Sequence, residues 1–360
     1  MTYSRPKQEK RAESEAIITT EIAVKGPDAI ALAALKAPFI WFGGKRRVAS
    51  RVWEALGDVQ SYVEPFAGSL AVLLGRPSWH TGRVETVNDA DHFLANFWRA
   101  LAADPEAVAI HADWPVNESD LFARHLWLVN EGRNRIAAME SDPEFHDVKV
   151  AGWWVWGICA WIGSGWCSGT GPWTYDDDDA GQGVNRKRPH LGDAGRGVSV
   201  STASVPTSVT PGRVSQLLAL ADRLRNVRVC CGDWSRVVTT GALSYGATVG
   251  VFLDPPYLGD VRTADLYAVD DYTIAHEVRE WAIANGDDPR LRIVLAGYDD
   301  EHDALMPATW RRYRYSASKA YGSAAGAGQN GVNRHKECLW FSSSCLDPVQ
   351  GTLFDGRDRQ

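Results

Sequence analysis

Residues 251–257 read VFLDPPY, an apolar run that ends in an acid, two prolines and a tyrosine. The apolar residues are typical of a buried central strand in an α/β sheet. Both prolines have a fixed φ and no N–H, so the segment after the strand is stiff and its carbonyls keep a set direction. Asp254 offers an acceptor for an exocyclic amine, and Tyr257 offers a ring that can stack on a flat base. A strand followed by a Pro-Pro turn with a surface tyrosine explains this stretch equally well, so the rest of the chain has to decide.

Outward from this stretch, apolar runs and helical patterns alternate along two parts of the chain. Such alternation favours an α/β fold in which a mostly parallel sheet has helices on both faces. Two segments near the end of this alternation, 312–316 and 337–342, are expected to pair as an antiparallel edge. The other predicted strands are 61–64, 84–88, 227–231, 248–253 and 291–296, and the predicted helices include 70–74, 93–101 and 214–224.

The alternation stops between residues 105 and 212. This part holds a helical pattern at 121–136, a tryptophan-rich segment at 153–166 and a tract rich in Gly, Ser, Thr and Asp. We interpret the tryptophans as the core of an insertion rather than as a ladder for base stacking. The predicted organisation is a catalytic domain of residues 37–104 and 212–343, an inserted mainly helical domain of residues 105–211 with a flexible loop at 169–211, a mobile tail at 1–36 and a second tail at 344–360.

The net charge argues against one class of nucleic-acid protein. The 360-residue chain has a formal charge of −7, whereas a protein that coats DNA needs many cations to neutralise phosphates. A site-specific enzyme is not excluded, because basic residues gather locally at 45–47, 186–188, 311–314 and 334–336. Each of these clusters is also explained as a solvated surface run.

Other features bound the location and the chemistry. No stretch approaches the ~18 apolar residues of a membrane span, and residues 1–25 lack the apolar segment of a signal peptide. We therefore expect a cytoplasmic protein with no membrane partner. The six cysteines have no zinc-ligand spacing, so they are interpreted as reduced thiols and no metal is expected.

Four motifs occur in one order along the chain. They are FIWFGGKR at 39–46, YVEPFAGS at 62–69, VND at 87–89 and DPPY at 254–257. In this order the chain resembles the Dam-like adenine-specific DNA methyltransferases, which use S-adenosylmethionine. The resemblance covers residues 38–101 and 214–342. It implies a Rossmann-like methyltransferase sheet in which the inserted segment is a target-recognition domain.

The resemblance and the strand ends together predict where the cofactor binds. In open α/β sheets, ligands bind at the carboxyl ends of the strands, and an acid there typically holds ribose hydroxyls. Asp89 is expected to take that role, and Asp233 is expected to accept from the adenine amino group of the cofactor. The predicted S-adenosylmethionine-binding residues are Trp41, Lys45, Glu64, Phe66, Gly68, Asp89, Asp233 and Asp254.

Three of these positions have a simpler explanation or depart from the family pattern. Asp89 or Asp91 would serve as the N-cap of the following helix, and Asp233 would cap a turn. The family has a glycine two residues after Gly68, where this chain has Leu70.

The DPPY motif supplies the predicted catalytic residues, Asp254, Pro255, Pro256 and Tyr257. The resemblance implies adenine as the target, since related cytosine-amino enzymes tend to have serine where Asp254 stands. The target base of a duplex must be flipped out and held by stacking and hydrogen bonds. The leading hypothesis is therefore a site-specific adenine N6-methyltransferase of double-stranded DNA.

Two alternatives stay open. The same chemistry suits a methyltransferase acting on another planar amine or amide, such as an RNA base, the cytosine amino group or a protein glutamine. A non-catalytic DNA-binding protein with this fold is the other. The sequence does not determine the recognised site, the oligomeric state or a restriction endonuclease partner.

Overall fold

The computed structural model describes part of the chain, which divides into two units, Met1–Leu35 and Lys36–Gln360. Predictions for the tail before residue 35, the loop at 169–211, Tyr257 and the tail after residue 347 lie outside the described residues. The described residues are 35–39, 41, 43–77, 82–142, 144–161, 166–167, 215–256, 268–315 and 337–347.

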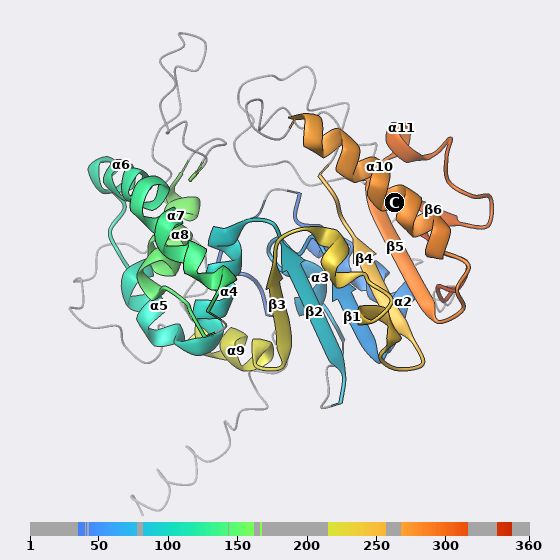
Figure 1. Cartoon of the computed structure of the whole chain (residues 1–360), viewed down its shortest axis with the longest axis horizontal. Helices are drawn as coiled ribbons and strands as arrows, with labels where there is room; N and C mark the ends of the chain where they lie inside the picture. Colours follow the sequence, from blue (N-terminus) through green and yellow to red (C-terminus); the bar gives the residue numbers. More distant parts are fainter. Residues whose placement is uncertain are drawn as a thin grey trace, which may run out of the picture. The chain divides into compact units, whose positions relative to one another are not determined.

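A seven-stranded sheet forms the centre of the second unit, in the order β3-β2-β1-β4-β5-β7-β6 (Figure 1). Strands β1 to β5 pair in parallel, and β7 runs antiparallel to both of its neighbours. The predicted parallel sheet and its antiparallel edge are thus confirmed. The strands are β1 (Ser61–Glu64), β2 (Val84–Asp89), β3 (Val227–Cys231), β4 (Val249–Leu253), β5 (Leu291–Tyr298), β6 (Arg311–Arg314) and β7 (Glu337–Phe341).

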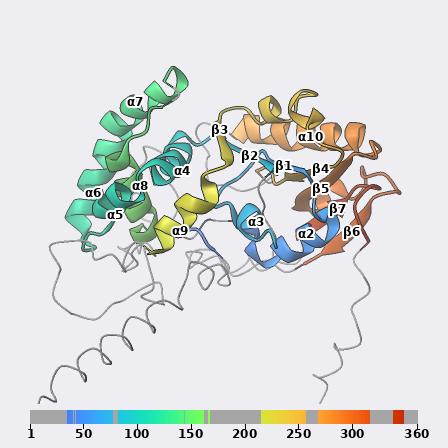
Figure 2. The same ribbon diagram turned by 90° about the horizontal axis from the view of Figure 1, so that it is seen from below.

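Helices cover both faces of this sheet. The helix α10 lies on one face, and α2 and α3 lie on the other (Figure 2). Every residue of β1, β4 and β7 is buried between these layers, as expected for the central strands of such a sheet. The helices that follow or precede the strands are α2 (Ala49–Leu56), α3 (Ala71–Leu74), α4 (His92–Ala103), α9 (Ser215–Leu224), α10 (Ala268–Asn285) and α11 (Asp299–His302).

The described part of the predicted insertion is helical. Trp154 and Trp156 of α8 are fully buried. Trp156 clusters with Leu121 and Trp161, whereas Trp154 packs on Phe39 and Phe97 of the predicted catalytic domain. The core predicted for the insertion is therefore shared with the catalytic part. The elements are α5 (Pro105–Ala112), α6 (Glu118–Trp127), the π-helical turn η3 (Leu128–Gly132), α7 (Arg133–Ile136), the 3-10 helix η4 (Ala137–Glu140) and α8 (Val148–Ala160). No helix in the described ranges is long and apolar enough to cross a membrane.

A buried cluster of charges fixes three elements to one another. Glu85 of β2 accepts hydrogen bonds from Arg223 of α9 at 2.6 and 2.8 Å and from Arg76, which follows α3, at 2.9 Å. The three side chains are at most 7% exposed. Since α9 leads directly into β3, this cluster determines where the chain re-enters the sheet after residue 214.

Replacing Glu85 with glutamine should destabilise the protein by about 3–5 kcal/mol, because two buried guanidinium groups would lose their common carboxylate. Urea unfolding measures this. The control is Asp58→Asn. Asp58 is another ion-pair partner of Arg76, but its side chain is 48% exposed, so this substitution should lower the stability by less than about 1 kcal/mol. Equal losses in the two variants would show that the buried cluster has no special weight.

Candidate active site

The predicted acids meet at one edge of the sheet. Glu64 is the last residue of β1 and Asp89 is the last residue of β2, while Asp233 and Asp254 follow β3 and β4. These four strands are parallel, so their carboxyl ends lie on the same side. Ligands of open α/β sheets bind at this edge.

Lys45 contacts the acid of the DPPY motif. It lies in the 3-10 helix η2 (Lys45–Arg47), and its Nζ is 2.9 Å from Oδ1 of Asp254 and 2.7 Å from the carbonyl oxygen of Gly43. Its side chain is only 5% exposed, and that of Asp254 is 17% exposed. Lys45 was predicted among the cofactor-binding residues, and in the structure its ammonium group pairs with Asp254. Two motifs that are far apart in the sequence thus form one charge-compensated pair.

Glu64 is buried beneath this pair. It is 2% exposed, and its Oε2 accepts from the Tyr62 hydroxyl at 2.9 Å and from the Leu73 backbone N–H at 3.2 Å. Burial raises the pKa of Glu64 to about 8, and the negative charge of Asp254 contributes to the increase. Glu64 is therefore largely protonated at neutral pH, and its described contacts link β1 to α3.

Asp89 joins β2 to the loop that follows β1. Its Oδ2 accepts from the Gly68 N–H at 2.9 Å and its Oδ1 from the Asp91 N–H at 3.0 Å. Burial raises the pKa of Asp89 to about 6. The N-cap of α4 is Asp91, whose Oδ1 accepts from the N–H groups of Phe93 and Leu94. Of the two acids considered for the cap, Asp91 therefore takes this role and Asp89 does not.

Gly68 allows a close approach to its backbone, and the group that approaches it is the side chain of Trp41 rather than a ligand. Its φ is +46°, and a Cβ atom there would lie 2.6 Å from Nε1 of Trp41. The Gly68 carbonyl also accepts from the Trp98 indole at 3.2 Å. Trp41 and Gly68, predicted as separate cofactor residues, are thus in direct contact.

Leu70 shows how the turn tolerates the missing family glycine. It adopts the left-handed conformation, with φ 56° and ψ 26°, immediately before α3. This conformation costs a residue with a Cβ about 1–2 kcal/mol. Leu70 is completely buried, and burial of a leucine side chain contributes about 1.5–3 kcal/mol, which offsets that cost. The predicted helix at 70–74 consequently begins at Ala71.

The loop after β3 carries a cap and an aromatic contact. Asp233 accepts from the backbone N–H of Ser235 at 2.9 Å and from its hydroxyl, so it caps the 3-10 helix η7 (Trp234–Val237), as its simpler explanation predicted. Phe66 stacks on Trp234 with ring centroids 6.2 Å apart. The loops after β1 and β3 therefore contact each other through these rings.

Asn88 was missed from the sequence, although it stands inside the VND motif. It is 2% exposed, and its Nδ2 donates to the carbonyls of Pro65 at 3.0 Å and Gly232 at 2.9 Å. The neighbouring acid, Asp89, is the residue of this motif that has a recognised ligand role. No local sequence pattern pairs Asn88 with Gly232. In the DPPY motif itself, Pro255 is buried and Pro256 is exposed, while Tyr257 lies outside the described residues.

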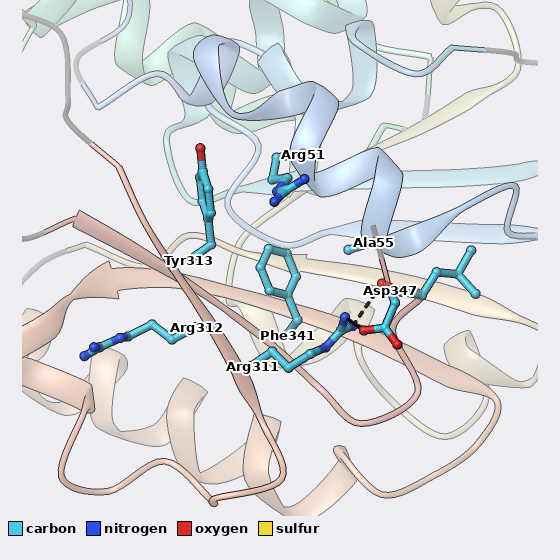
Figure 3. A pocket seen from close by; sticks show the side chains of 8 residues that line it. Arg51, Ala55, Arg311, Arg312, Tyr313, Phe341 and Asp347 are labelled. Carbon is cyan, nitrogen blue, oxygen red and sulfur yellow. Dashed lines mark hydrogen bonds and ion pairs between the residues drawn. The ribbon is translucent and has the colours of Figure 1, made fainter. Parts of the chain in front are cut away.

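A cavity of about 490 Å³ lies elsewhere, between α2 and the β6–β7 edge (Figure 3). Its arginines are ion-paired, with Arg51 on Glu54, Arg311 on Asp347 and Arg312 on Asp303. None of the predicted site residues lines it. Its lining consists of Arg51, Ala55, Arg311, Arg312, Tyr313, Phe341, Leu346 and Asp347.

The described ranges hold no group of three or more His, Cys, Asp or Glu residues placed to bind a metal ion. Of the four basic clusters in the sequence, 186–188 and 334–336 lie outside these ranges. In the cluster at 311–314, Arg314 pairs with Asp299, and the other two arginines pair at the cavity. This cluster is therefore compensated locally, as a surface run would be.

The strand order and the helices on both faces of the sheet fit an α/β Rossmann-like fold. Residues 41–148 match the model of the D12 class N6 adenine-specific DNA methyltransferase family. This match bears out the resemblance to the Dam-like enzymes and supports an adenine-specific DNA methyltransferase. The match includes Trp41, Lys45 and Asp89, continues through α5 to α7, and ends before Asp254. No curated protein matches the chain.

The pKa of Glu64 predicts a pH dependence of stability. Between the ordinary value of 4.5 and the folded value of about 8, the folded state binds a proton that the unfolded state has lost. The stabilisation from this proton is complete below pH 4.5 and is lost as the pH rises through about 8. Relative to Glu64→Gln, the wild-type protein should therefore lose stability across this window.

Urea unfolding at a series of pH values from 4.5 to 9 measures the difference between the two proteins. Glu54→Gln, at an exposed position of α2, controls for the loss of one carboxylate. A constant difference between wild type and Glu64→Gln over the whole range would contradict the assignment.

Proposed function

We propose that this chain transfers a methyl group from S-adenosylmethionine to N6 of an adenine flipped out of double-stranded DNA, at a specific sequence. The observation that carries the proposal is the ion pair of Lys45 and Asp254 at the carboxyl end of β4, beside the loops that end β1, β2 and β3. The pair joins the two motifs that a base-modifying methyltransferase requires, and the family match names adenine and DNA.

Asp254 is the acceptor for the target amine. The amine nitrogen becomes positive as it attacks, so a fixed carboxylate stabilises the transition state more than the ground state. A carboxylate has two oxygens and about four acceptor sites. Asp254 therefore has the capacity to hold Lys45 and the amine together, while Pro255 and Pro256 keep the loop stiff. Tyr257 is proposed to stack on the flipped adenine.

The cofactor residues are proposed at the ends of β1 to β3. Asp89 accepts two backbone N–H groups and retains acceptor capacity for ribose hydroxyls. Asp233 is exposed, and both of its described bonds fall on Oδ1, which suits a further contact to an adenine amino group. Trp41, Glu64, Phe66 and Gly68 form the remainder of this pocket. When bound, S-adenosylmethionine supplies the electrophilic methyl group.

DNA is proposed to lie across the same edge, with residues 105–211 reading the target sequence and residues 37–104 and 212–343 forming the catalytic domain. Arg46 and Arg47 are exposed in the short helix that buries Lys45. Two cations therefore stand next to the point where the target base enters. Contacts of this kind to phosphates set the register of a protein on DNA.

Methyl transfer from labelled S-adenosylmethionine to duplex DNA tests the proposed function. Digestion to nucleosides should place the label on N6-methyladenine and on no other base. Label on cytosine, RNA or protein in parallel reactions would select one of the alternative amine or amide substrates. Binding of DNA without transfer to any of them would favour a non-catalytic protein.

Asp254→Ala should lower the single-turnover methylation rate about 10²–10³-fold, because one positioned transition-state acceptor is removed. Affinities for cofactor and DNA should change much less. The control is Asp288→Ala, which removes an acid paired with Arg290 at 2.7 Å before β5, at the opposite edge of the sheet. A wild-type rate for Asp254→Ala would disprove this catalytic site.

Replacing Arg46 and Arg47 together with glutamine should weaken DNA binding and reduce its salt dependence. Each lost phosphate contact lowers the slope of log K against log salt by about 0.9, so a reduction of about 1–2 is expected. Fluorescence anisotropy at several salt concentrations measures the slope. Arg225→Gln, an exposed change just before β3, should leave it unaltered. An unchanged slope in the double variant would move the phosphate contacts away from η2.

A further inference from the structure

The side chain of Asn88 bridges two loops that belong to different strands. One N–H of its amide donates to the carbonyl of Pro65 after β1, and the other donates to the carbonyl of Gly232 after β3. Asn88 stands on β2, between these two strands in the sheet. The backbone around it repeats the pattern, because Ala67 N–H donates to the Asn88 carbonyl at 2.9 Å and Gly232 N–H donates to the Asp89 carbonyl at 3.1 Å.

The chemistry of this bridge requires a primary amide. Two carbonyl oxygens need two N–H or O–H donors from one short side chain, and among residues of this size asparagine alone has both. Its Oδ1 has no hydrogen-bond partner among the described residues. The amide orientation is nevertheless fixed, since a reversed amide would place Oδ1 against the two carbonyls.

The two bridged loops flank the acids that are proposed to hold the adenosine group. The loop after β1 contains Gly68, whose N–H is bound to Asp89 on the ribose side. The loop after β3 contains Asp233 on the adenine side. A ligand that spans both loops binds well only when their separation is set in advance, because otherwise binding must order them.

We infer that Asn88 is a positioning residue for the cofactor: it fixes the distance between the ribose-side and adenine-side loops through its two amide hydrogen bonds. This inference rests on the proposed function. It concerns adenosine-containing ligands and leaves the methyl-transfer step to Asp254. The role of Asn88 should therefore be visible in the KM for S-adenosylmethionine and in the affinity for S-adenosylhomocysteine, and not in kcat at saturating cofactor.

Three variants test the inference. Asn88→Asp keeps the size of the side chain but places an acceptor against each carbonyl, and Asn88→Ser retains one donor. The control is Asn96→Asp on α4, a fully buried asparagine. Its side chain forms hydrogen bonds with the backbone of Asp147 at 2.9 and 3.0 Å, and among the described residues it has no hydrogen bond to either bridged loop. Calorimetry with S-adenosylhomocysteine, steady-state kinetics and thermal unfolding are measured for all three variants.

We expect the affinity to fall roughly 10- to 100-fold for Asn88→Asp, as for the loss of two hydrogen bonds, and less for Asn88→Ser. The KM for S-adenosylmethionine should rise in parallel, while kcat and the KM for DNA stay near wild type. Asn96→Asp should lower the melting temperature without changing the affinity. If Asn88→Asp does not fold, Asn88→Ser decides.

Wild-type affinity in the Asn88 variants would overturn the inference, as would an equal loss of affinity in Asn96→Asp, which would indicate general destabilisation. A fall in kcat with unchanged KM would also contradict it. Failure of the wild-type protein to bind S-adenosylhomocysteine at all would instead refute the proposed cofactor, so the two failures are distinguishable.

Discussion

The parallel alignment of β1 to β4 is the constraint on which the candidate site depends. It brings the carboxyl ends of four separate strands to one edge, and in this chain four carboxylic acids lie at or just after those ends. Acids gathered at one edge repel one another, and those that are buried also lose hydration. Each acid is therefore stabilised in its own way, either by contacts with donors or cations or by keeping its proton.

Asp254 and Glu64 show the two extremes. Asp254 has a lysine at 2.9 Å, so its negative charge is compensated by a cation carried on a motif some two hundred residues earlier. Burial and, to a smaller extent, the charge of Asp254 raise the pKa of Glu64 to about 8. Glu64 therefore keeps a proton at neutral pH. One acid at this edge is thus held by an ion pair and the other is neutral at physiological pH. That difference separates the acid proposed to meet a developing positive charge from one whose described contacts join β1 to α3.

Much of this arrangement could be predicted from the sequence, because the periodicity of the chain is simple. The strand at 251–253 is apolar on both faces and the helix at 93–101 has a clear apolar stripe, so element type and sheet class followed directly. The placement of Asp89, Asp233 and Asp254 followed from the strand ends. Contacts that depend on pairs distant in the sequence could not be predicted. Neither the Lys45–Asp254 pair nor the bridge from Asn88 to Gly232 has any local pattern.

Leu70 shows a second limit of prediction from sequence, because tertiary packing overrides a local backbone preference at this position. A glycine is favoured where the backbone is left-handed, and the absence of one suggested a changed turn. The turn is preserved because Leu70 is completely buried, and that burial offsets the backbone cost. Tertiary packing also explains Gly68, whose freedom serves contact with Trp41. The β1 loop is therefore shaped first by the protein's own aromatic and aliphatic side chains. The Gly68 N–H is directed toward Asp89 as a consequence of that packing, so the edge that carries the proposed cofactor residues depends on the core beneath it.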